Sequence, residues 1–385
     1  MSRKRDPIYV TKPAVPPRSE LEPYLERIWE SAILTNCGPM HQEFEHELAK
    51  ILEVPEVSLF CNATIAMAAS FNALRLTGEV ITTPFSFVAT THSLHWSGIR
   101  PAFVDIDPFT LNLDPSKIEA AIRPSTSAIL PVHVYGTPCD TDAIARIADL
   151  HGLRVVYDAA HAFGVRQQGR SILNQGDASI LSFHATKTFN TFEGGAVICR
   201  DRKLKQRLDY LRNFGFADEV TVVLPGINGK MNELQAAIGL VQLKHFEEEV
   251  KARSNIDRIY RERLAQIRGI RLVDLAPDTT SNYGYFPILV GPDFPLTRDE
   301  LYQRLREHDI FARRYFYPLI SEFPMYADLP TASMKNLPVA YQVSRQVLCL
   351  PIYSKLSIDD VERIVEIIST ASKTHHRRGS RLHNV

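Results

Sequence analysis

The sequence of 385 residues contains no apolar run near the roughly 18 residues that a membrane-spanning helix needs. Its basic N-terminal stretch, MSRKRDPIYVTKPAVPP, is not followed by a hydrophobic segment, so a signal peptide is not expected. These two absences predict a cytoplasmic protein that has no membrane partner.

Cysteine is scarce, and neither sign of charge is in excess. The cysteines at positions 37, 61, 139, 199 and 349 lack CxxC spacing, which fits reduced thiols better than a disulfide framework or a zinc site. No metal is therefore expected. The 44 basic and 44 acidic residues cancel, which leaves no overall field to recruit nucleic acid. Small molecules and a second copy of the chain are the expected partners.

Short apolar strands alternate with amphipathic helices from about residue 57 onward, which is typical of a mostly parallel α/β sheet covered by helices. The predicted strands are VSLFC, EVITT, PAFVDID, SAILPVHVYG, LRVVYDAA, ASILSFH and AVIC. A long proline-free helix, MNELQAAIGLVQLKHFEEEVKARSNIDRIYRERLAQI, is expected next. The chain is long enough for two domains. We expect a large α/β domain over residues 1–250, including the N-terminal segment, and a smaller α+β domain over residues 251–385.

The smaller domain is expected to contain a strand YGYFPILV, a helix TRDELYQRLREHD, a strand QVLCLPIY and a final helix. Ser357 and Asp360 resemble a capping box at the start of this last helix, whose apolar residues recur at helical spacing. The polar tail SKTHHRRGSRLHNV is expected to fray.

A strand, a tight junction and a helix are predicted in VSLFCNATIAMAASFNALRL. The free N–H groups and positive dipole end of this helix suit a phosphate, and Thr64 can add a hydroxyl. The alternative, which has more weight for this stretch alone, is that Asn62 or Thr64 only caps the helix. Neither GxGxxG nor GxxxxGK[ST] occurs here, which disfavours a dinucleotide or P-loop site.

Asp158 lies at the carboxyl end of a predicted buried strand, where open α/β sheets place ligands. A structural ion pair or helix cap is an equally open interpretation, and His161 could be a hydrogen-bonded core histidine. Lys187 follows one strand later, between an apolar run and a Glu-Gly-Gly turn, so it can reach the same edge of the sheet. A lysine in a partly desolvated pocket has a lowered pKa and can form a Schiff base.

Pyridoxal 5′-phosphate (PLP) would bring these three parts together. It has an aldehyde for Lys187, a ring nitrogen for Asp158 and a phosphate for the helix N-terminus. Lys187 is then expected to hold the cofactor at rest and later to carry a proton between the substrate carbon and the cofactor's C4′.

Four stretches, TTPFSFVATTHSL, DAAHAFG, SFHATKTFNTFEGGA and GINGKMNELQAAIGL, closely resemble the DegT/DnrJ/EryC1/StrS family of PLP-dependent sugar aminotransferases. The likeness extends from about residue 8 to 370 and implies the aspartate aminotransferase fold (fold type I). It makes Lys187 the Schiff-base residue and Asp158 the partner of the ring nitrogen. It places His161 beside the cofactor's phenolic oxygen and Phe87 on the ring, with core packing as the alternative for Phe87.

The resemblance also implies contacts to the cofactor phosphate, and with them a homodimer. These contacts would come from Thr64, the backbone N–H of Ile65, Ser182 and, from the neighbouring subunit, Asn228. The family commonly has glycine where Ala63 stands, so the backbone approaches the phosphate less closely here, and it commonly has arginine where Lys230 stands. Relatives with histidine in place of the lysine are dehydratases. Because this chain keeps Lys187, that branch is set aside.

By this resemblance, the reaction is amination of a keto group on a nucleotide-linked deoxysugar, with L-glutamate leaving as 2-oxoglutarate. The stretches LPVHVYGTPCD and RRYFYPLISEFPMYADLP favour the conversion of dTDP-4-keto-6-deoxy-D-glucose to dTDP-4-amino-4,6-dideoxy-D-glucose. Amination at C-3 and a UDP- or GDP-linked sugar are the alternatives, because no motif encodes how the sugar lies. Arg313, Arg314 and Tyr317 are candidate substrate contacts, with a purely structural role as the alternative. The rival of another class is a non-catalytic regulatory protein of the same fold.

Overall fold

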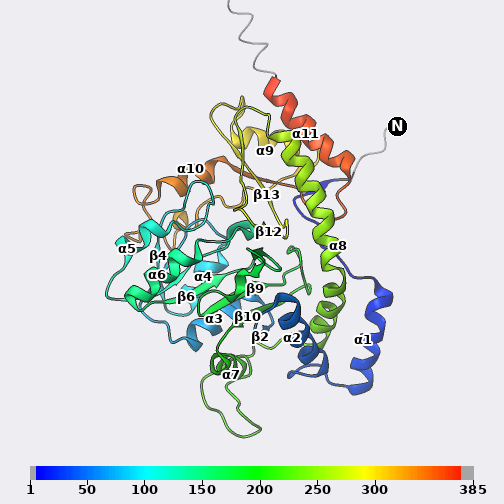
Figure 1. The fold of residues 1–385 in the computed structure, drawn as a ribbon, viewed down its shortest axis with the longest axis vertical. Coiled ribbons are helices and arrows are strands. Elements are labelled where there is room, and N and C mark those ends of the chain that lie inside the picture. Colours follow the sequence, from blue (N-terminus) through cyan, green and yellow to red (C-terminus); the bar gives the residue numbers. More distant parts are fainter. Residues whose placement is uncertain (1–5, 374–385) are drawn as a thin grey trace, which may run out of the picture.

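The computed structural model describes residues 6–373, so the tail expected to fray lies outside the described residues from position 374 onward. A seven-stranded sheet forms the centre of the larger part of the molecule (Figure 1). Only β10 runs antiparallel to its neighbours in this sheet, and the other pairings are parallel. The predicted α/β fold with a mostly parallel sheet is confirmed. In spatial order the strands are β2 (Glu56–Phe60), β10 (Gly195–Cys199), β9 (Ala178–Ser182), β6 (Arg154–Asp158), β5 (Thr126–Leu130), β3 (Glu79–Thr82) and β4 (Arg100–Phe103).

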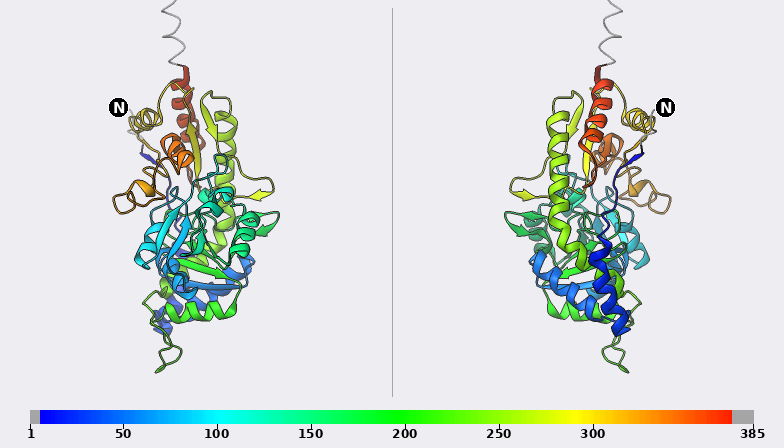
Figure 2. Two further views of the ribbon diagram at one scale, coloured as in Figure 1. Left: turned by 90° about the vertical axis from the view of Figure 1, so that its left-hand side faces the viewer. Right: turned by 90° about the vertical axis from the view of Figure 1, so that its right-hand side faces the viewer.

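Helices cover this sheet, and the two side views show them on both of its faces (Figure 2). The helix that follows β2 is buried along most of its length because almost all of its side chains are small or apolar. It packs with the sheet residues Val80, Ile180 and Val197 in one core cluster. The helices of this part are α1 (Arg18–Ser31), α2 (Pro39–Leu52), α3 (Ala63–Ala73), α4 (Ala89–Trp96), α5 (Ile118–Ala121), α6 (Thr141–His151) and α7 (Arg202–Leu211).

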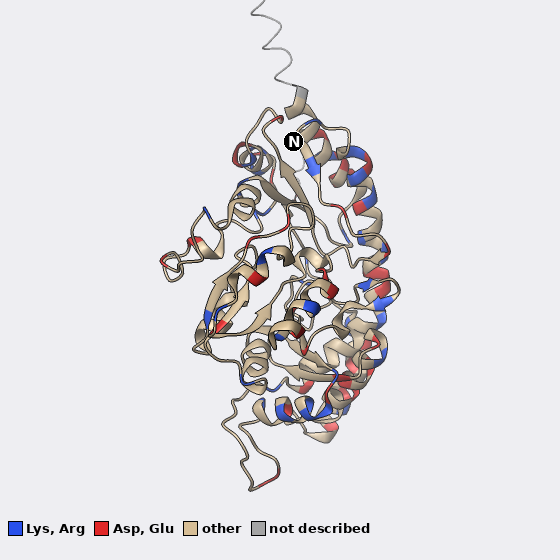
Figure 3. Cartoon of the chain, turned by 60° about the vertical axis from the view of Figure 1, so that its left-hand side comes forward, with Lys and Arg blue, Asp and Glu red and all other residues tan. Residues whose placement is uncertain are grey.

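A single long helix, α8 (Glu233–Leu264), connects the two parts of the chain along one side of the molecule (Figure 1). Asn232 caps its start: the Asn232 side chain accepts from the Gln235 N–H, and the Gln235 side chain accepts from the Asn232 N–H. Both signs of charge are interspersed along this helix (Figure 3). The predicted boundary between residues 250 and 251 falls inside α8, so the two-domain division stays a proposal.

The C-terminal part is built on a three-stranded antiparallel sheet in the order β11-β13-β15. Its last helix begins as expected, because Ser357 Oγ accepts from the Asp360 N–H at 3.1 Å. The strands and helices here are β11 (Ile270–Leu272), β13 (Phe286–Val290), α9 (Arg298–Arg306), α10 (Pro338–Gln346), β15 (Val347–Leu350) and α11 (Ile358–Lys373).

The first strand of the N-terminal segment packs against the C-terminal part, whereas α1 and α2 belong to the large part. β1 (Ile8–Tyr9) pairs in parallel with β14 (Ile310–Phe311), and the buried Ile8 side chain joins the core of the C-terminal part. Short elements complete the chain: β7 (Arg166–Gln167), β8 (Arg170–Ser171), β12 (Thr279–Thr280), η1 (Pro115–Lys117), η2 (Val134–Gly136), η3 (Ile172–Asn174) and η4 (Ile320–Glu322).

Among residues 6–373, no helix combines the length and the apolar character needed to cross a membrane. The same part of the chain contains no group of three or more His, Cys, Asp or Glu side chains placed to hold a metal ion.

Candidate active site

A pocket of about 280 Å³ opens at the carboxyl ends of β6 and β9, beside the N-terminus of α3. Most of its lining comes from the large sheet and the loops that follow its strands, and Tyr285, Tyr315 and Phe316 close it from the C-terminal part. The pocket brings Asp158, His161, Ser182 and Lys187 together although they come from different strands or loops. Parallel strands place their following loops at one edge, which explains this convergence.

Lys187 follows β9 and projects into this pocket. Its Nζ donates a hydrogen bond to Tyr285 Oη at 3.2 Å. Burial disfavours the ammonium form and lowers the pKa of Lys187 to about 8, against the opposing effect of Asp158. A substantial fraction of this lysine is therefore the neutral, nucleophilic amine near neutral to mildly basic pH.

Asp158 is the last residue of β6, and its side chain is buried. Its Oδ2 accepts from Thr90 Oγ1 at 2.6 Å, and its Oδ1 accepts from the Ala160 N–H at 3.1 Å. Burial raises the pKa of Asp158, while these two hydrogen bonds and Lys187 oppose the shift. Asp158 forms no salt bridge within the described chain, so it is not part of a structural ion pair there.

His161 lies under the pocket with only 6% of its surface exposed. Its Nδ1 accepts from the Tyr135 N–H at 3.2 Å, and its ring centroid lies 4.7 Å from that of Tyr285. Burial, and then the charge of Lys187, hold the pKa of His161 well below its usual range. The imidazole is thus neutral, with Nδ1 already engaged, and it leaves Nε2 as the donor that could face a ligand.

The N-terminus of α3 lies at one end of the pocket, which Asn62, Ala63 and Thr64 line. Asn62 is the cap, because its Oδ1 accepts from the Ile65 N–H at 2.9 Å. A phosphate contact at the Ile65 N–H would have to share or replace this bond. The N–H groups of Ala63 and Thr64 lie at the start of the helix and have no acceptor within it. They are therefore better placed than the Ile65 N–H to donate hydrogen bonds to a phosphate.

The Glu-Gly-Gly turn brings β10 against the start of α3. A Cβ on Gly195 would lie 2.6 Å from the backbone nitrogen of Ala63 and 2.7 Å from the carbonyl carbon of Asn62. No side chain can occupy that space, so the second glycine lets the strand and the helix N-terminus meet. Glu193 and Gly194 line the pocket directly before this contact.

Phe87 and Ser182 both line the pocket. Phe87 is 57% exposed, which rules out core packing as the explanation for this aromatic residue. Ser182 ends β9, and its Oγ accepts only a long hydrogen bond of 3.4 Å from the His184 N–H. The Phe87 ring and the Ser182 hydroxyl are therefore both free to contact a ligand.

Arg313, Arg314 and Tyr317, the candidate substrate contacts, do not line this pocket, and their role toward the substrate stays a proposal. Arg314 Nη1 instead pairs with Asp299 Oδ1 at 2.9 Å, and its guanidinium lies 5.2 Å from the centroid of the Tyr317 ring. Arg313 exchanges backbone hydrogen bonds with Cys349. The residues between them, Tyr315 and Phe316, line the pocket.

Asn228 is exposed and lies outside the pocket of its own chain. Its Oδ1 accepts from Lys230 Nζ at 2.9 Å. The segment is held from behind, because the Gly229 N–H donates to the Arg212 carbonyl at 2.9 Å and the Gly229 carbonyl accepts from the Cys61 N–H at 2.8 Å.

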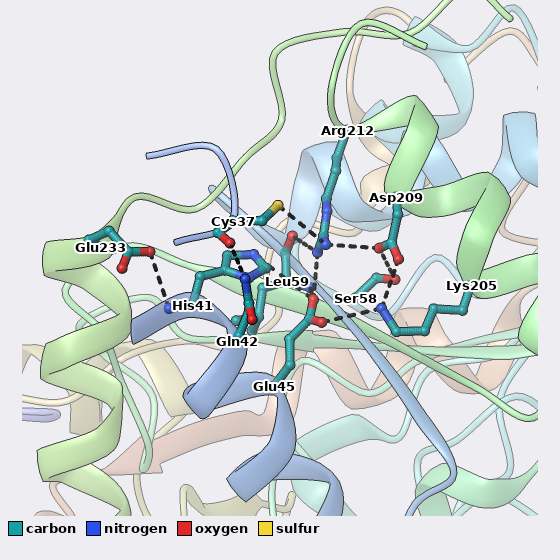
Figure 4. Close-up of polar contacts among 10 residues, drawn as sticks. All are labelled: Cys37, His41, Gln42, Glu45, Ser58, Leu59, Lys205, Asp209, Arg212 and Glu233. Carbon is teal, nitrogen blue, oxygen red and sulfur yellow. Dashed lines mark hydrogen bonds and ion pairs between the residues drawn. The ribbon is translucent and has the colours of Figure 1, made fainter. Parts of the chain in front are cut away.

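A buried polar network anchors Arg212 behind this segment (Figure 4). Arg212 Nη1 pairs with Glu45 Oε1 at 2.6 Å, and Nη2 pairs with Asp209 Oδ1 at 2.9 Å. Lys205 Nζ closes the ring of charges at 3.2 Å from Glu45 and 2.8 Å from Asp209. Burial opposes ionisation of Glu45, but Arg212 and its neighbours still lower the pKa of Glu45 to about 2.

Sequence reasoning did not single out Tyr285, Thr90 or Ser86. Thr90 holds Asp158, and Ser86 Oγ lies 2.8 Å from Thr90 Oγ1, so these hydroxyls orient the carboxylate. Both lie in the stretch TTPFSFVATTHSL, whose unusual density of hydroxyls was the available signal. Tyr285 lies among apolar residues before β13, and nothing in that pattern links it to a lysine almost a hundred positions away.

The residues of this pocket fit PLP. Asp158 is a buried acceptor without a cationic partner in contact, and a protonated ring nitrogen would supply one. Lys187 is the amine for an aldehyde, Phe87 provides an exposed ring, and the start of α3 faces the same space. Six of the residues named from the sequence line this one pocket, and their individual roles stay proposals: Thr64, Phe87, Asp158, His161, Ser182 and Lys187.

Comparisons with known proteins agree with this geometry. The family model for the DegT/DnrJ/EryC1/StrS aminotransferase family matches residues 17–369. The chain is 52% identical over 363 residues to a dTDP-4-amino-4,6-dideoxy-D-glucose transaminase of Shigella dysenteriae, covering 94% of this chain and 98% of that protein.

Two solved structures are similar as well. DesI, in the presence of its TDP-sugar product, has a TM-score of 0.92 at 36% identity, covering 99% of this chain and 97% of DesI. NtdA of Bacillus subtilis, with bound cofactor PMP, has a TM-score of 0.85 at 29% identity, covering 92% of this chain and 82% of NtdA. The expected resemblance is confirmed over most of the sequence, and the chain belongs to the DegT/DnrJ/EryC1/StrS family of PLP-dependent aminotransferases.

Proposed function

We propose that this protein transfers the amino group of L-glutamate to C-4 of dTDP-4-keto-6-deoxy-D-glucose, forming dTDP-4-amino-4,6-dideoxy-D-glucose and 2-oxoglutarate. The aminotransferase activity rests on one observation above all: Lys187 and the buried Asp158 line one pocket at the start of α3. The choice of sugar and nucleotide is supported by the 52% identity to a transaminase with that product.

PLP, when bound, supplies the electron-withdrawing ring that allows a proton to leave the carbon bearing the amine. Asp158 would hold the ring nitrogen protonated, and Thr90 keeps the carboxylate oriented toward it. Lys187 Nζ, with a pKa of about 8, can accept and return the proton at neutral to mildly basic pH. Tyr285 Oη holds that amine within the pocket, because burial keeps the pKa of the phenol far above neutrality and the phenol stays uncharged.

The substrate assignment is tested with a panel of 3-keto and 4-keto deoxysugars linked to dTDP, UDP or GDP. Each is incubated with the enzyme and L-glutamate, and NMR identifies the carbon that carries the new amine. We expect strong preference for the dTDP-linked 4-keto sugar, because unmatched hydroxyls would leave buried polar groups unpaired. Preference for a 3-keto sugar, or for a UDP- or GDP-linked sugar, would contradict the proposed substrate but not the aminotransferase activity.

The role of Lys187 is tested by borohydride reduction of the purified protein followed by peptide mapping. The cofactor label should appear on the Lys187 peptide alone, and Lys187→Ala should lose it. Lys335→Ala, which removes an exposed lysine outside the pocket, is the matched control and should be labelled normally. A protein that binds no cofactor and aminates no sugar of the panel would favour the regulatory alternative.

A homodimer with shared sites is the assembly that we propose for this enzyme. The segment from Asn213 to Asn228 projects from the large part of the molecule as an extended loop (Figure 1). It carries a cluster of exposed apolar side chains, which monomeric proteins rarely present in contiguous patches. These are Phe214, Phe216, Val220, Val222, Val223 and Ile227. A second copy covering this loop would bring Asn228 toward its pocket. The cytoplasmic location stays a prediction.

Mixed dimers test this arrangement. Lys187→Ala and Asn228→Ala subunits, each impaired alone, are unfolded together and refolded as a mixture. If Asn228 serves the partner's pocket, the hybrid has one site with both substitutions and one intact site, so activity returns to a fraction of the wild-type value. Sedimentation measures the oligomeric state of the same samples. Dimers without any recovered activity would contradict a contact from the neighbouring subunit.

A further inference from the structure

A second pocket, of about 480 Å³, lies at the opposite end of α3 from the candidate active site. It is bounded by the C-terminal end of α3, the first residue of β6, the residues before β9, the residues after β10, and α7. The 11 residues of α3 span about 16 Å, so the two pockets are separated by the length of this helix.

Basic side chains dominate the lining of this second pocket. Four arginines and one lysine face two aspartates there. They are Arg75, Arg154, Arg200, Lys203 and Arg207, with Asp177 and Asp201 as the acidic residues. A chain with no net charge has thus concentrated positive charge around one concave surface.

Both aspartates already have partners. Asp177 Oδ1 pairs with Arg154 Nη1 at 2.8 Å, and its Oδ2 accepts from the Val155 N–H at 2.8 Å. Asp201 caps α7, where its Oδ1 accepts from the Lys203 N–H at 2.8 Å. Asp177 thus neutralises Arg154, while Asp201 keeps its negative charge, so the five basic and two acidic side chains leave the lining with a net charge of about +3.

The other four basic side chains, those of Arg75, Arg200, Lys203 and Arg207, have no ion pair within residues 6–373. Arg75, Arg200 and Lys203 are also exposed, so their charged ends are accessible to a ligand in the pocket. Several arginines around one cavity suit the oxygens of a phosphate group, which accept hydrogen bonds from the planar guanidinium.

We propose that this pocket is a binding site for a small phosphorylated anion, separate from the site of amino transfer. Arg75, which follows α3, and Arg207, which lies on α7, bind the phosphate oxygens. Lys203 and Arg200 add positive charge at the rim. The pocket volume admits a diphosphate as well as a single phosphate.

The test uses the cofactor-loaded enzyme and two probes, inorganic phosphate and pyrophosphate, with binding measured by isothermal titration calorimetry. The variants are Arg75→Gln, Arg207→Gln and the double substitution. The matched control is Arg202→Gln, which removes an exposed arginine from the same helix, α7, but from outside the pocket. We expect pyrophosphate affinity to fall about tenfold or more for each pocket arginine, as for other hydrogen bonds to charged groups. Arg202→Gln should leave it unchanged.

Two further measurements separate this site from the active site and from misfolding. Turnover of the double variant should equal that of the wild type, because the substituted residues lie outside the catalytic pocket. Lys203→Gln is a milder change on the exposed rim and should weaken binding less than either arginine variant. An unchanged isotherm in the double variant, or an equal loss in Arg202→Gln, would overturn the proposal.

Discussion

Two buried clusters of charged side chains lie in the large part of the molecule, and their pKa values shift in opposite directions. In the catalytic pocket, burial lowers the pKa of Lys187 and raises that of Asp158, so both groups move toward their neutral forms. In the network of Figure 4, the pKa of Glu45 is lowered and that of Arg212 is raised despite burial, so both stay charged.

The difference follows from how completely each cluster is paired. Arg212 lies within 2.9 Å of both Glu45 and Asp209, and these ion pairs outweigh the loss of hydration. Within residues 6–373, the Lys187 amine has only the neutral Tyr285 phenol as a hydrogen-bond partner. A cluster in which every charge has an oppositely charged partner stabilises the fold. A cluster whose ionisable groups lack such partners can instead bind a ligand that carries the complementary charge.

The largest effect is expected from Lys187→Ala. Turnover should fall by at least about 10³-fold, because Lys187 is the proposed nucleophile and the proposed proton carrier. The free energy of unfolding should change little, since no ion pair is broken. Steady-state kinetics and urea unfolding, with Lys335→Ala as the control, measure both quantities. A large loss of stability with this substitution would contradict the claim that only the paired network of Figure 4 stabilises the fold.

Arg212→Gln should instead lower the free energy of unfolding strongly. Removing one partner of a buried ion pair typically costs about 3–5 kcal/mol, and here it leaves Glu45 and Asp209 facing each other. Urea unfolding should show this loss. The control is Arg258→Gln, which breaks the exposed pair with Glu262 and should cost under about 1 kcal/mol. Similar losses of unfolding free energy in Arg212→Gln and Arg258→Gln would show that the buried network stabilises the fold no more than an exposed ion pair does.

His41 should contribute to the pH dependence of the free energy of unfolding. Burial, and then Arg212, lower the pKa of this histidine from 6.5 to about 4, so the folded protein keeps it neutral. The unfolded chain binds a proton first as pH falls, and stability is lost between about pH 6.5 and 4 with a slope of up to about 1.4 kcal/mol per pH unit. In His41→Gln this slope should be shallower. His46→Gln, an exposed histidine on the same helix, should retain it.

The smallest expected effect is that of Tyr285→Phe. Loss of the acceptor for Lys187 Nζ should lower the pKa of the lysine further below about 8, by a fraction of a unit, because one hydrogen bond contributes about 1 kcal/mol. The pH dependence of reductive methylation at Lys187, followed by mass spectrometry in cofactor-free protein, measures it. Tyr9→Phe, which alters an exposed tyrosine, should give the wild-type profile. An unshifted profile in Tyr285→Phe would mean that the phenol does not position the amine.

The sequence by itself determined the order of the sheet-forming elements and the short motifs at strand ends. Alternating apolar runs specify strands and helices locally, and the residue directly after a parallel strand must lie at the ligand-binding edge. Asp158 and Lys187 could therefore be named without a structure, and so could Asn62 as a possible cap for α3.

Only the tertiary structure decided which distant side chains share one environment. The bond from Lys187 to Tyr285 and the pairing of β1 with β14 join segments far apart in the chain, and the ion pair of Arg314 with Asp299 joins the loop after β14 to the start of α9. The same holds for the four unpaired basic side chains between α3 and α7. Whether a charge is paired depends on packing between elements, and no local pattern records packing, because it is the sum of contacts that form only when the whole chain has folded.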